Sequence, residues 1–180
     1  MTTFVALLRG INVGGKHSVP MQDLRDILDG LGCKDVETYI QSGNAVFNSA
    51  EDAQVLAAQV SSAIEQKFGF APRVHILTFE EYQAVLDANP FPDAVSEPKT
   101  IHVGFLTEPV TEPDLDTIEN LKSPTENYHL VEGAFYLHAP DGIGRSKLAA
   151  KIDKCLGVPT TGRNWRSATK LAELAVTIVK

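Results

Sequence analysis

The sequence predicts an α+β protein made of two similar halves, each in the ferredoxin-like order βαββα(β), with antiparallel or mixed sheets and helices packed on one face. Three observations predict this fold. Short β-rich runs alternate with amphipathic helical segments in both halves. Each half holds a hairpin around a glycine, Gly43 in TYIQSGNAVF and Gly133 in NYHLVEGAFYL. A proline-rich segment, residues 89–98, separates them. We therefore expect an internal duplication of roughly 80–90 residues.

The first half contains the complete βαββαβ order. Strands are expected at residues 3–9, 36–41, 45–48 and 73–77, and helices at residues 20–31 and 49–68. Pro20 suits the first turn of the first helix, and Ser49 with Asp52 predicts a capping box for the second. Gly69 is expected to end that helix, and Thr78 is expected to cap a short third one.

The second half repeats this order and leaves its fourth strand open. Strands are expected at residues 100–106, 127–131 and 134–139, and helices at residues 111–121 and 146–156. Leu115, Ile118 and Leu121 are the expected inward positions of the first of these helices. The last helix begins at Asn164 or Ser167. The fourth strand is either residues 160–165 or the β-branched tail, residues 176–179.

Domain boundaries follow from this order. The first half with its short third helix spans residues 1–88, the linker spans residues 89–98, and the second half with the C-terminal helix spans residues 99–180. The three prolines of the linker make it the best boundary in the chain.

Composition indicates a globular, cytoplasmic protein. Hydrophobic residues make up 43% and charged residues 22% of the chain, which is ordinary for a folded domain. No apolar run approaches the ~20 residues that a membrane span needs, and the run at residues 4–8 is too short for a secretory signal. The two cysteines, Cys33 and Cys155, have neither disulfide nor metal-ligand spacing. We expect no membrane association and no metal site.

The net charge of −7 hides an asymmetry along the chain. Residues 145–170 hold seven Lys and Arg residues and one Asp, a net charge of +6, whereas the other residues hold nine basic and 22 acidic side chains, a net charge of −13. Two interpretations remain open. The basic segment is either a solvated helix face or an anion site in an acidic protein, which would repel long polyanions and admit small ones.

A first candidate site combines the glycine-rich loop after the first strand with the turn before the third. The first two strands of a βαββ unit run parallel, so both segments lie at one end of the sheet. Arginine suits a carboxylate or phosphate, and glycine lets backbone N–H groups approach a ligand. The alternative is that glycine and asparagine only serve the tight turns. The candidate ligand-binding residues are Arg9, Asn12, Gly14, Lys16, Ser42 and Asn44.

A second candidate lies in PDGIGRSKLAAKI. Ser146 is expected to cap a helix whose first residue is Lys147. A basic side chain is unfavourable at the positive end of a helix dipole, unless an anion sits beside it. The glycine–lysine spacing is not that of a Walker A loop. We expect Lys147 to face a pocket that it shares with Arg163.

The third candidate, PTTGRNWRSATKL, surrounds the single tryptophan. Arg163, Asn164 and Trp165 are its candidate ligand-binding residues. Trp165 either anchors the last helix in the core or forms a stacking platform for a base or a sugar, flanked by guanidinium groups. Both roles are compatible, because one ring face can be buried while the other is open.

Five segments together resemble one bacterial family: LLRGINVGG, MQDLRDILDGLG, VETYIQSGNAVF, GIGRSKL and TTGRNW are similar to the motifs of domain of unknown function 1697. The resemblance covers nearly the whole chain. It implies a cytoplasmic α+β protein of two similar halves, and it assigns no role to the matching positions. Family members more usually lack Gly162 between Thr161 and Arg163, which affects where Arg163 points. The matching positions are Arg9, Gly10, Asn12, Val13, Gly14, Ser42, Gly43, Asn44, Ser146, Lys147, Arg163, Asn164 and Trp165.

Other chemistry is poorly represented. The five histidines show no metal-ligand spacing, and His75, His102 and His138 lie in strand patterns where we expect hydrogen-bonded structural residues. Neither cysteine has a base partner, so a thiol nucleophile is not expected. The sequence specifies no cofactor and no reaction.

Three functions remain at this stage. The favoured one is binding of a small phosphorylated or carboxylated ligand, with or without catalysis. The second is binding of single-stranded nucleic acid, which the acidic surface and the lack of sheet-face aromatic residues disfavour. The third is a protein-interaction module without a ligand. Salt dependence separates the first two, because polymer binding weakens steeply with salt.

Overall fold

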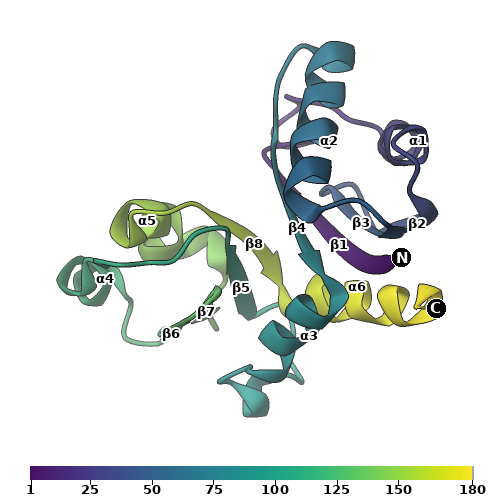
Figure 1. Cartoon of the computed structure of the whole chain (residues 1–180). Helices are drawn as coiled ribbons and strands as arrows, with labels where there is room; N and C mark the ends of the chain where they lie inside the picture. The colour runs from purple at the N-terminus through teal and green to yellow at the C-terminus, as the bar shows by residue number, and fades with distance from the viewer. Residues whose placement is uncertain (180) are drawn as a thin grey trace. The chain divides into compact units, whose positions relative to one another are not determined.

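The computed structural model describes residues 1–179, and their contacts divide the chain into two compact units. The first unit comprises Met1–Ala84 together with the last helix from Thr169 onward, and the second comprises Val85–Ala168. Figure 1 shows the elements of both. None of the helices in the described part of the chain is long and apolar enough to cross a membrane.

The first unit is built on a four-stranded antiparallel sheet of order β2-β3-β1-β4. This is the strand order of a ferredoxin-like fold, in which the non-adjacent strands β1 and β2 run parallel. Its elements are β1 (Thr2–Arg9), α1 (Met21–Gly30), β2 (Lys34–Thr38), β3 (Asn44–Ser49), α2 (Ala53–Phe68), β4 (Arg73–Thr78) and the start of α3 (Phe79–Asp87).

Both faces of this sheet are covered within the first unit. Phe4, Ala6 and Leu8 alternate along β1 and pack in one core with α1 and α2, the helices seen beside the sheet in Figure 1. The intervening Val5 and Leu7 point to the other face and are fully buried as well. On that face the side chain of Asn48 donates a hydrogen bond of 2.8 Å to the carbonyl of Ile178 in α6. The expected packing of helices on one face is thus correct for α1 and α2, and α6 adds a second layer.

The second unit repeats the sheet, in the order β6-β7-β5-β8. Its fourth strand is β8 at Thr160–Asn164, so the first of the two sequence alternatives is correct. Its elements are β5 (Ile101–Leu106), α4 (Leu115–Leu121), β6 (Asn127–Val131), β7 (Ala134–His138), α5 (Lys147–Leu156), β8 (Thr160–Asn164) and the start of α6 (Trp165–Ile178), with short 3-10 turns at Pro92–Ala94 and Ile143–Arg145.

The glycine of each hairpin accepts an equivalent hydrogen bond from the central strand beside it. Gly43 and Gly133 have φ angles of +80° and +82°. The amide of Leu8, near the end of β1, donates to the carbonyl of Gly43 at 2.8 Å, and the amide of Leu106, at the end of β5, donates to that of Gly133 at 3.0 Å. The two halves therefore share their strand order and the register of their central strands. Their hairpin turns differ in length, because Thr38 pairs with Ala45 whereas Val131 pairs with Ala134.

Several expected details are wrong at element ends. Ser49 does not cap α2: it is a buried residue of β3, and the side chain of Asp52 accepts from the amides of Gln54 and Val55 instead. Leu115 is 50% exposed rather than inward, because Asp114 caps α4 and leaves Leu115 in the outward first turn.

The expected linker differs from the division that the contacts give. Residues 89–98 belong to the second unit. Phe91 lies against that unit's sheet, with its ring centroid 5.6 Å from that of His129 and 5.5 Å from that of His138. Three prolines thus shape a segment that packs on its own unit.

Candidate functional site

The glycine-rich loop after β1 is a small hairpin of its own. Val13 and Lys16 form a β-bridge, and the amide of Lys16 donates to the carbonyl of Val13 at 3.1 Å. The two residues between them, Gly14 and Gly15, have φ angles of +59° and +71°, as the preferred two-residue turn requires. The turn therefore accounts for both glycines. All four residues are exposed, so the hairpin presents Lys16 to solvent.

Asn12 joins this loop to the turn before β3. Its side-chain amide nitrogen donates to the carbonyls of Val19 and Gln41 at 2.9 and 2.7 Å, and its oxygen accepts from the amide of Val19 at 2.8 Å. The expectation that the loop and the turn meet at one end of the sheet is confirmed. Asn12 uses both ends of its carboxamide on the protein, so it positions the loop.

The turn itself is tightly built. Asn44 is fully buried and donates to the carbonyl of Tyr39 at 3.1 Å and to the hydroxyl of Ser42 at 2.7 Å. A Cβ atom on Gly43 would lie 2.7 Å from Cβ of Leu8 and 2.9 Å from Cδ1 of Ile11, so only glycine fits. Ser42 and Asn44 therefore hold the shape of this end of the sheet.

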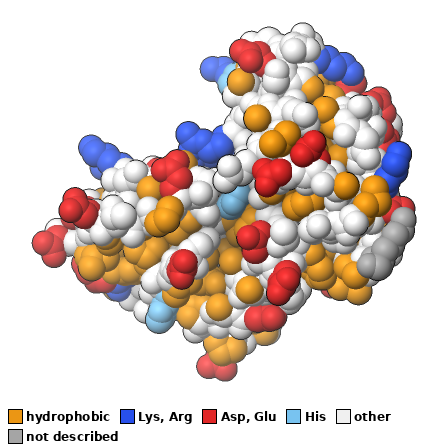
Figure 2. Space-filling view, in the orientation of Figure 1, with side chains coloured by type: hydrophobic (Ala, Val, Ile, Leu, Met, Phe, Trp, Pro, Cys, Tyr) orange, Lys and Arg blue, Asp and Glu red, His pale blue; other side chains and the backbone are white. Residues whose placement is uncertain are grey.

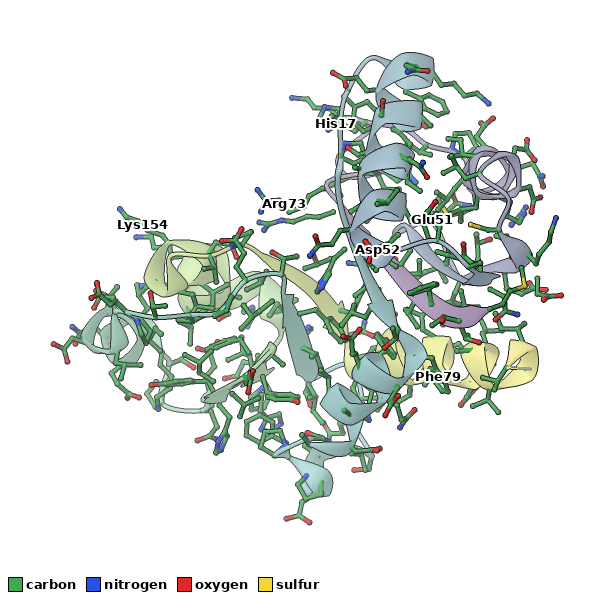
Figure 3. The ribbon with its side chains drawn as sticks, in the orientation of Figure 1. His17, Glu51, Asp52, Arg73, Phe79 and Lys154 are labelled. Atoms are coloured by element: carbon green, nitrogen blue, oxygen red, sulfur yellow. The ribbon has the colours of Figure 1, made fainter. Side chains whose placement is uncertain are left out.

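Two arginines face each other at the same end. Arg9, the last residue of β1, pairs with Arg73, the first residue of β4, and both are exposed. Like charges directly opposite each other on neighbouring strands are destabilising. Among the described residues the guanidinium of Arg73 has no hydrogen-bond or ion-pair partner. Figure 3 shows the Arg73 side chain extending away from α2.

The sequence-based candidate list lacks Arg73. Its place opposite Arg9 depends on the register of β1 against β4, which residue patterns do not specify. The available signal was the combination of two features: an arginine at the last position of one strand, and another at the first position of a strand expected to run antiparallel to it.

A ring stack completes this end of the first unit. His17 and Phe70 have ring centroids 4.3 Å apart and ring planes 19° apart, and Nδ1 of His17 lies 3.1 Å from the carbonyl oxygen of Gly10. The backbone of His17 is in the left-handed region, with φ +53°. Figure 2 shows a cationic side chain beside a histidine on this part of the molecule. Neither ring was among the sequence candidates.

The second candidate has the local structure that the sequence predicts. Ser146 is the N-cap of α5, and its hydroxyl accepts from the amide of Ala149 at 3.0 Å. Lys147 is the first helical residue and is exposed, as is Arg145 in the preceding 3-10 turn. The basic first turn is therefore present, on the second unit.

Arg163 and Lys147 are not brought together as expected. Side chains alternate between sheet faces, and Arg163 pairs with Val103 while Asn164 pairs with His102. The core that contains α5 is built on the face of Leu106 and Leu137, to which His102 and Asn164 also belong. Arg163 consequently projects from the opposite face, and its Nη1 donates to the carbonyl of Gly162 at 2.8 Å. The expectation of a pocket shared by Lys147 and Arg163 is wrong.

Asn164 and Trp165 begin the last helix. The side-chain oxygen of Asn164 accepts from the amide of Ser167 at 2.9 Å, so Asn164 is the cap and Ser167 lies inside the helix. Trp165 is half-buried as the first residue of α6. In the third candidate site, Asn164 therefore caps the last helix, and Trp165 is partly exposed.

Burial shifts the pKa of four further titratable groups, two histidines and two cysteines. Burial lowers the pKa of His75 to about 4, partly opposed by the charge of Glu81, and burial lowers the pKa of His102. Contrary to expectation, one buried ring nitrogen of each histidine has no hydrogen-bond partner among the described residues. Burial raises the pKa of the Cys33 and Cys155 thiols, which keeps both protonated at neutral pH. The described residues contain no cluster of His, Cys, Asp or Glu that fits a metal ion.

These features define a two-unit α+β protein with a ferredoxin-like sheet in each unit. The sequence profile of the family described as "Protein of unknown function (DUF1697)" matches residues 1–136, and the chain belongs to that family. The chain is similar to the solved structure of the conserved bacterial protein SP0830 from Streptococcus pneumoniae. The two share 25% identity over 97% of this chain and 98% of that one, with a TM-score of 0.75. No curated protein matches the chain.

Proposed function

We propose that this protein binds a small phosphorylated or carboxylated molecule at the loop end of the first unit. The observation that carries the proposal is the direct pairing of Arg9 with Arg73 across β1 and β4. The guanidinium of Arg73 has no hydrogen-bond or ion-pair partner among the described residues, and a bound anion would supply one. The planar forks of N–H donors on both arginines suit carboxylate and phosphate oxygens.

The neighbouring hairpin adds a third cation and backbone donors. Lys16 lies in the loop that begins one residue after Arg9, and Asn12 fixes that loop against the sheet. No atom lies within 4 Å of the position that a Cβ atom would take on Gly14 or on Gly15. An anion approaching this turn therefore meets no side chain of the turn itself.

The first turn of α5 supports a separate anion site on the second unit. Its backbone amides and the exposed Lys147 and Arg145 are favourable for an anion at a helix N-terminus. If this site binds the ligand, Lys147→Ala weakens binding about tenfold, the effect of losing one charge-assisted hydrogen bond. Arg163 is not part of this site.

Thermal unfolding in phosphate, carboxylates and chloride at equal ionic strength tests the proposal. A ligand that binds only the folded state raises the midpoint, and the rise grows with the logarithm of the ligand concentration above the dissociation constant. We expect phosphate or a small carboxylate to raise the midpoint of the wild type, and Arg73→Ala to weaken this response about tenfold in concentration.

Lys34→Ala is the matched control. Lys34 is an exposed cation of the same sheet, but it pairs with Asn48 at the end opposite Asn44 and the turn. It removes the same charge without touching the proposed site. An equal response of Arg73→Ala and Lys34→Ala contradicts the site, and the absence of any wild-type response contradicts the function.

We further propose that the protein is cytoplasmic. We also propose that it arose by duplication of one half. Both cysteines are free and buried, as suits a reducing compartment. The common strand order and the equivalent glycine hydrogen bonds support a duplication. Single-stranded nucleic acid and a protein partner remain the competing ligands, and a steep fall of binding with salt identifies the former.

A further inference from the structure

The edge strand β6 of the second sheet lacks the features that protect edge strands. An edge strand presents unpaired N–H and C=O groups, and proteins commonly protect it with charged side chains or a β-bulge. In the first sheet, the edge strand β2 has both, because its register shifts between the charged residues Lys34 and Glu37. The edge strands β4 and β8 each contain an arginine. The five residues of β6, Asn127–Val131, include no Lys, Arg, Asp or Glu and pair with β7 without a shift.

The backbone of β6 directs hydrogen-bonding groups to its open side. Gly133, just before β7, accepts a hydrogen bond of 3.0 Å from β5. Backbone groups alternate in direction along a strand, so Tyr136 of β7 directs its N–H and C=O groups toward β6, where it pairs with His129. The N–H and C=O groups of Tyr128 and Leu130 therefore point away from β7. Within the described part of the chain, β7 is the one strand that pairs with β6.

A groove with apolar walls lies beside this open edge. It has a volume of about 490 Å³ and is lined by α4 and β6, with Leu115, Tyr128 and Leu130 among its apolar residues. Leu115 is 50% exposed. The groove also contains Glu119 and Lys122, whose charges have opposite signs. Figure 2 shows hydrophobic side chains gathered between α4 and β6. A neutral strand with apolar side chains therefore suits this groove better than an acidic or a basic strand.

We propose that the occupant is a second copy of this chain, whose β6 pairs antiparallel with this β6 about a two-fold axis at His129. In this register Tyr128 of one copy lies opposite Leu130 of the other, so their outward N–H and C=O groups bond directly. Directly opposite residues share one face of a sheet. The ring and the aliphatic side chain therefore meet on the α4 side, where both residues already pack against the core of the second unit.

The strand is thus complementary to itself, as a two-fold interface requires. Two sheets of four strands become one continuous sheet, and each copy covers the open edge of the other. This inference does not depend on the proposed anion site.

Sedimentation velocity of the full-length chain over a dilution series tests the proposal. We expect the wild type to form a dimer. His129→Lys and His129→Glu each place like charges opposite each other at the axis, and each should raise the dissociation constant about a hundredfold. An equimolar mixture of the two variants places opposite charges there and should restore the dimer. Gln59→Lys is the matched control, because it adds a positive charge at an exposed position of α2 and should leave the dimer unchanged.

Amide hydrogen exchange of the wild type locates the interface without a substitution. The amides of Tyr128 and Leu130 should exchange more slowly at protein concentrations where the dimer forms than after dilution, because each becomes hydrogen-bonded across the axis. Equal exchange of these two amides at both concentrations overturns the pairing of β6.

The other outcomes are equally decisive. A wild type that is monomeric at every concentration at which it stays soluble overturns the proposal. A dimer that persists in both His129 variants places the interface elsewhere and overturns it too. A mixture of the two variants that stays monomeric overturns the two-fold register at His129, and assembly beyond a dimer overturns the closed pair.

Discussion

The end of β1 and the end of β5 occupy the same place in two sheets of one design, yet they carry different chemistry. Leu8 and Leu106 donate to the hairpin glycines Gly43 and Gly133, which aligns β1, β3 and β4 with β5, β7 and β8. The first end is closed around its glycine, whose missing Cβ would contact Leu8 and Ile11. The second is open, with no atom within 4 Å of a Cβ on Gly133.

The charges differ as strongly as the packing. In this alignment Arg9 corresponds to Thr107, and Arg73 corresponds to Pro159. The loop after β1 contains three glycines, Lys16 and His17, whereas residues 107–114 after β5 contain no glycine, no cation and three acidic residues. The second sheet forms without an arginine pair or a glycine hairpin. A sheet of this strand order therefore does not require them.

The largest expected effect concerns the two hairpin glycines. Gly43→Ala combines a left-handed backbone with a close contact to Leu8 Cβ, and should lower the free energy of unfolding by about 4 kcal/mol. Gly133→Ala has the backbone cost alone, about 1 kcal/mol. Urea denaturation measures both. Equal losses would show that the closed and open ends do not differ in packing.

The next effect is acid sensitivity at His75, which corresponds to the uncharged Thr161 of the second sheet. Burial lowers the pKa of His75 from 6.5 to about 4, so between these values the unfolded chain binds more protons. The contribution of neutral His75 to the free energy of unfolding is complete above pH 6.5. It is lost as pH falls toward 4, by up to about 3 kcal/mol. His75→Thr should flatten the dependence of unfolding free energy on pH in this window. An unchanged slope would assign the effect to other groups.

Asn12 gives the third effect, because the second unit has no equivalent clamp. Asn12→Ala removes three side-chain hydrogen bonds that join the glycine loop to Val19 and Gln41. The expected loss is about 2 kcal/mol, since the loop is partly solvated. It should be accompanied by weaker anion binding, because Lys16 and His17 lose their support. Stability and phosphate response are measured on the same sample. A stable variant with intact binding contradicts the positioning role of Asn12.

The smallest effect is that of Arg73→Ala on stability. Removing one of two opposed like charges should leave the unfolding free energy unchanged or raise it by about 0.5 kcal/mol at low salt. Added salt should abolish the gain through screening. A loss above about 1 kcal/mol would indicate that Arg73 stabilises the fold, and would remove the charge argument for a ligand.

Local signals in the sequence account for much of this structure. Gly43 and Gly133 mark the hairpins, Ser146 marks the start of α5, and chain order alone places the glycine loop beside the Ser42 turn. These features depend on turn chemistry, capping and topology, which short segments carry.

The parts of the candidate site that could not be predicted depend on strand register and on tertiary packing. A shift of one residue in strand register moves every side chain to the other face. For this reason the sequence does not show that Arg163 projects from the face opposite α5, or that Arg73 lies opposite Arg9. The stack of His17 on Phe70 joins residues 53 positions apart, which no local pattern specifies. The candidate site is therefore only partly predictable from the sequence.

The most direct test of the central claim is a nuclear magnetic resonance titration of the isotope-labelled protein with phosphate. The account predicts saturable shifts of the Gly14, Gly15 and Lys16 amides and of the Arg73 side-chain Nε resonance, with the Thr107 amide unmoved. Saturating shifts confined to Lys147 and its neighbours would transfer the site to α5, and the absence of saturating shifts at either place would contradict anion binding by this protein.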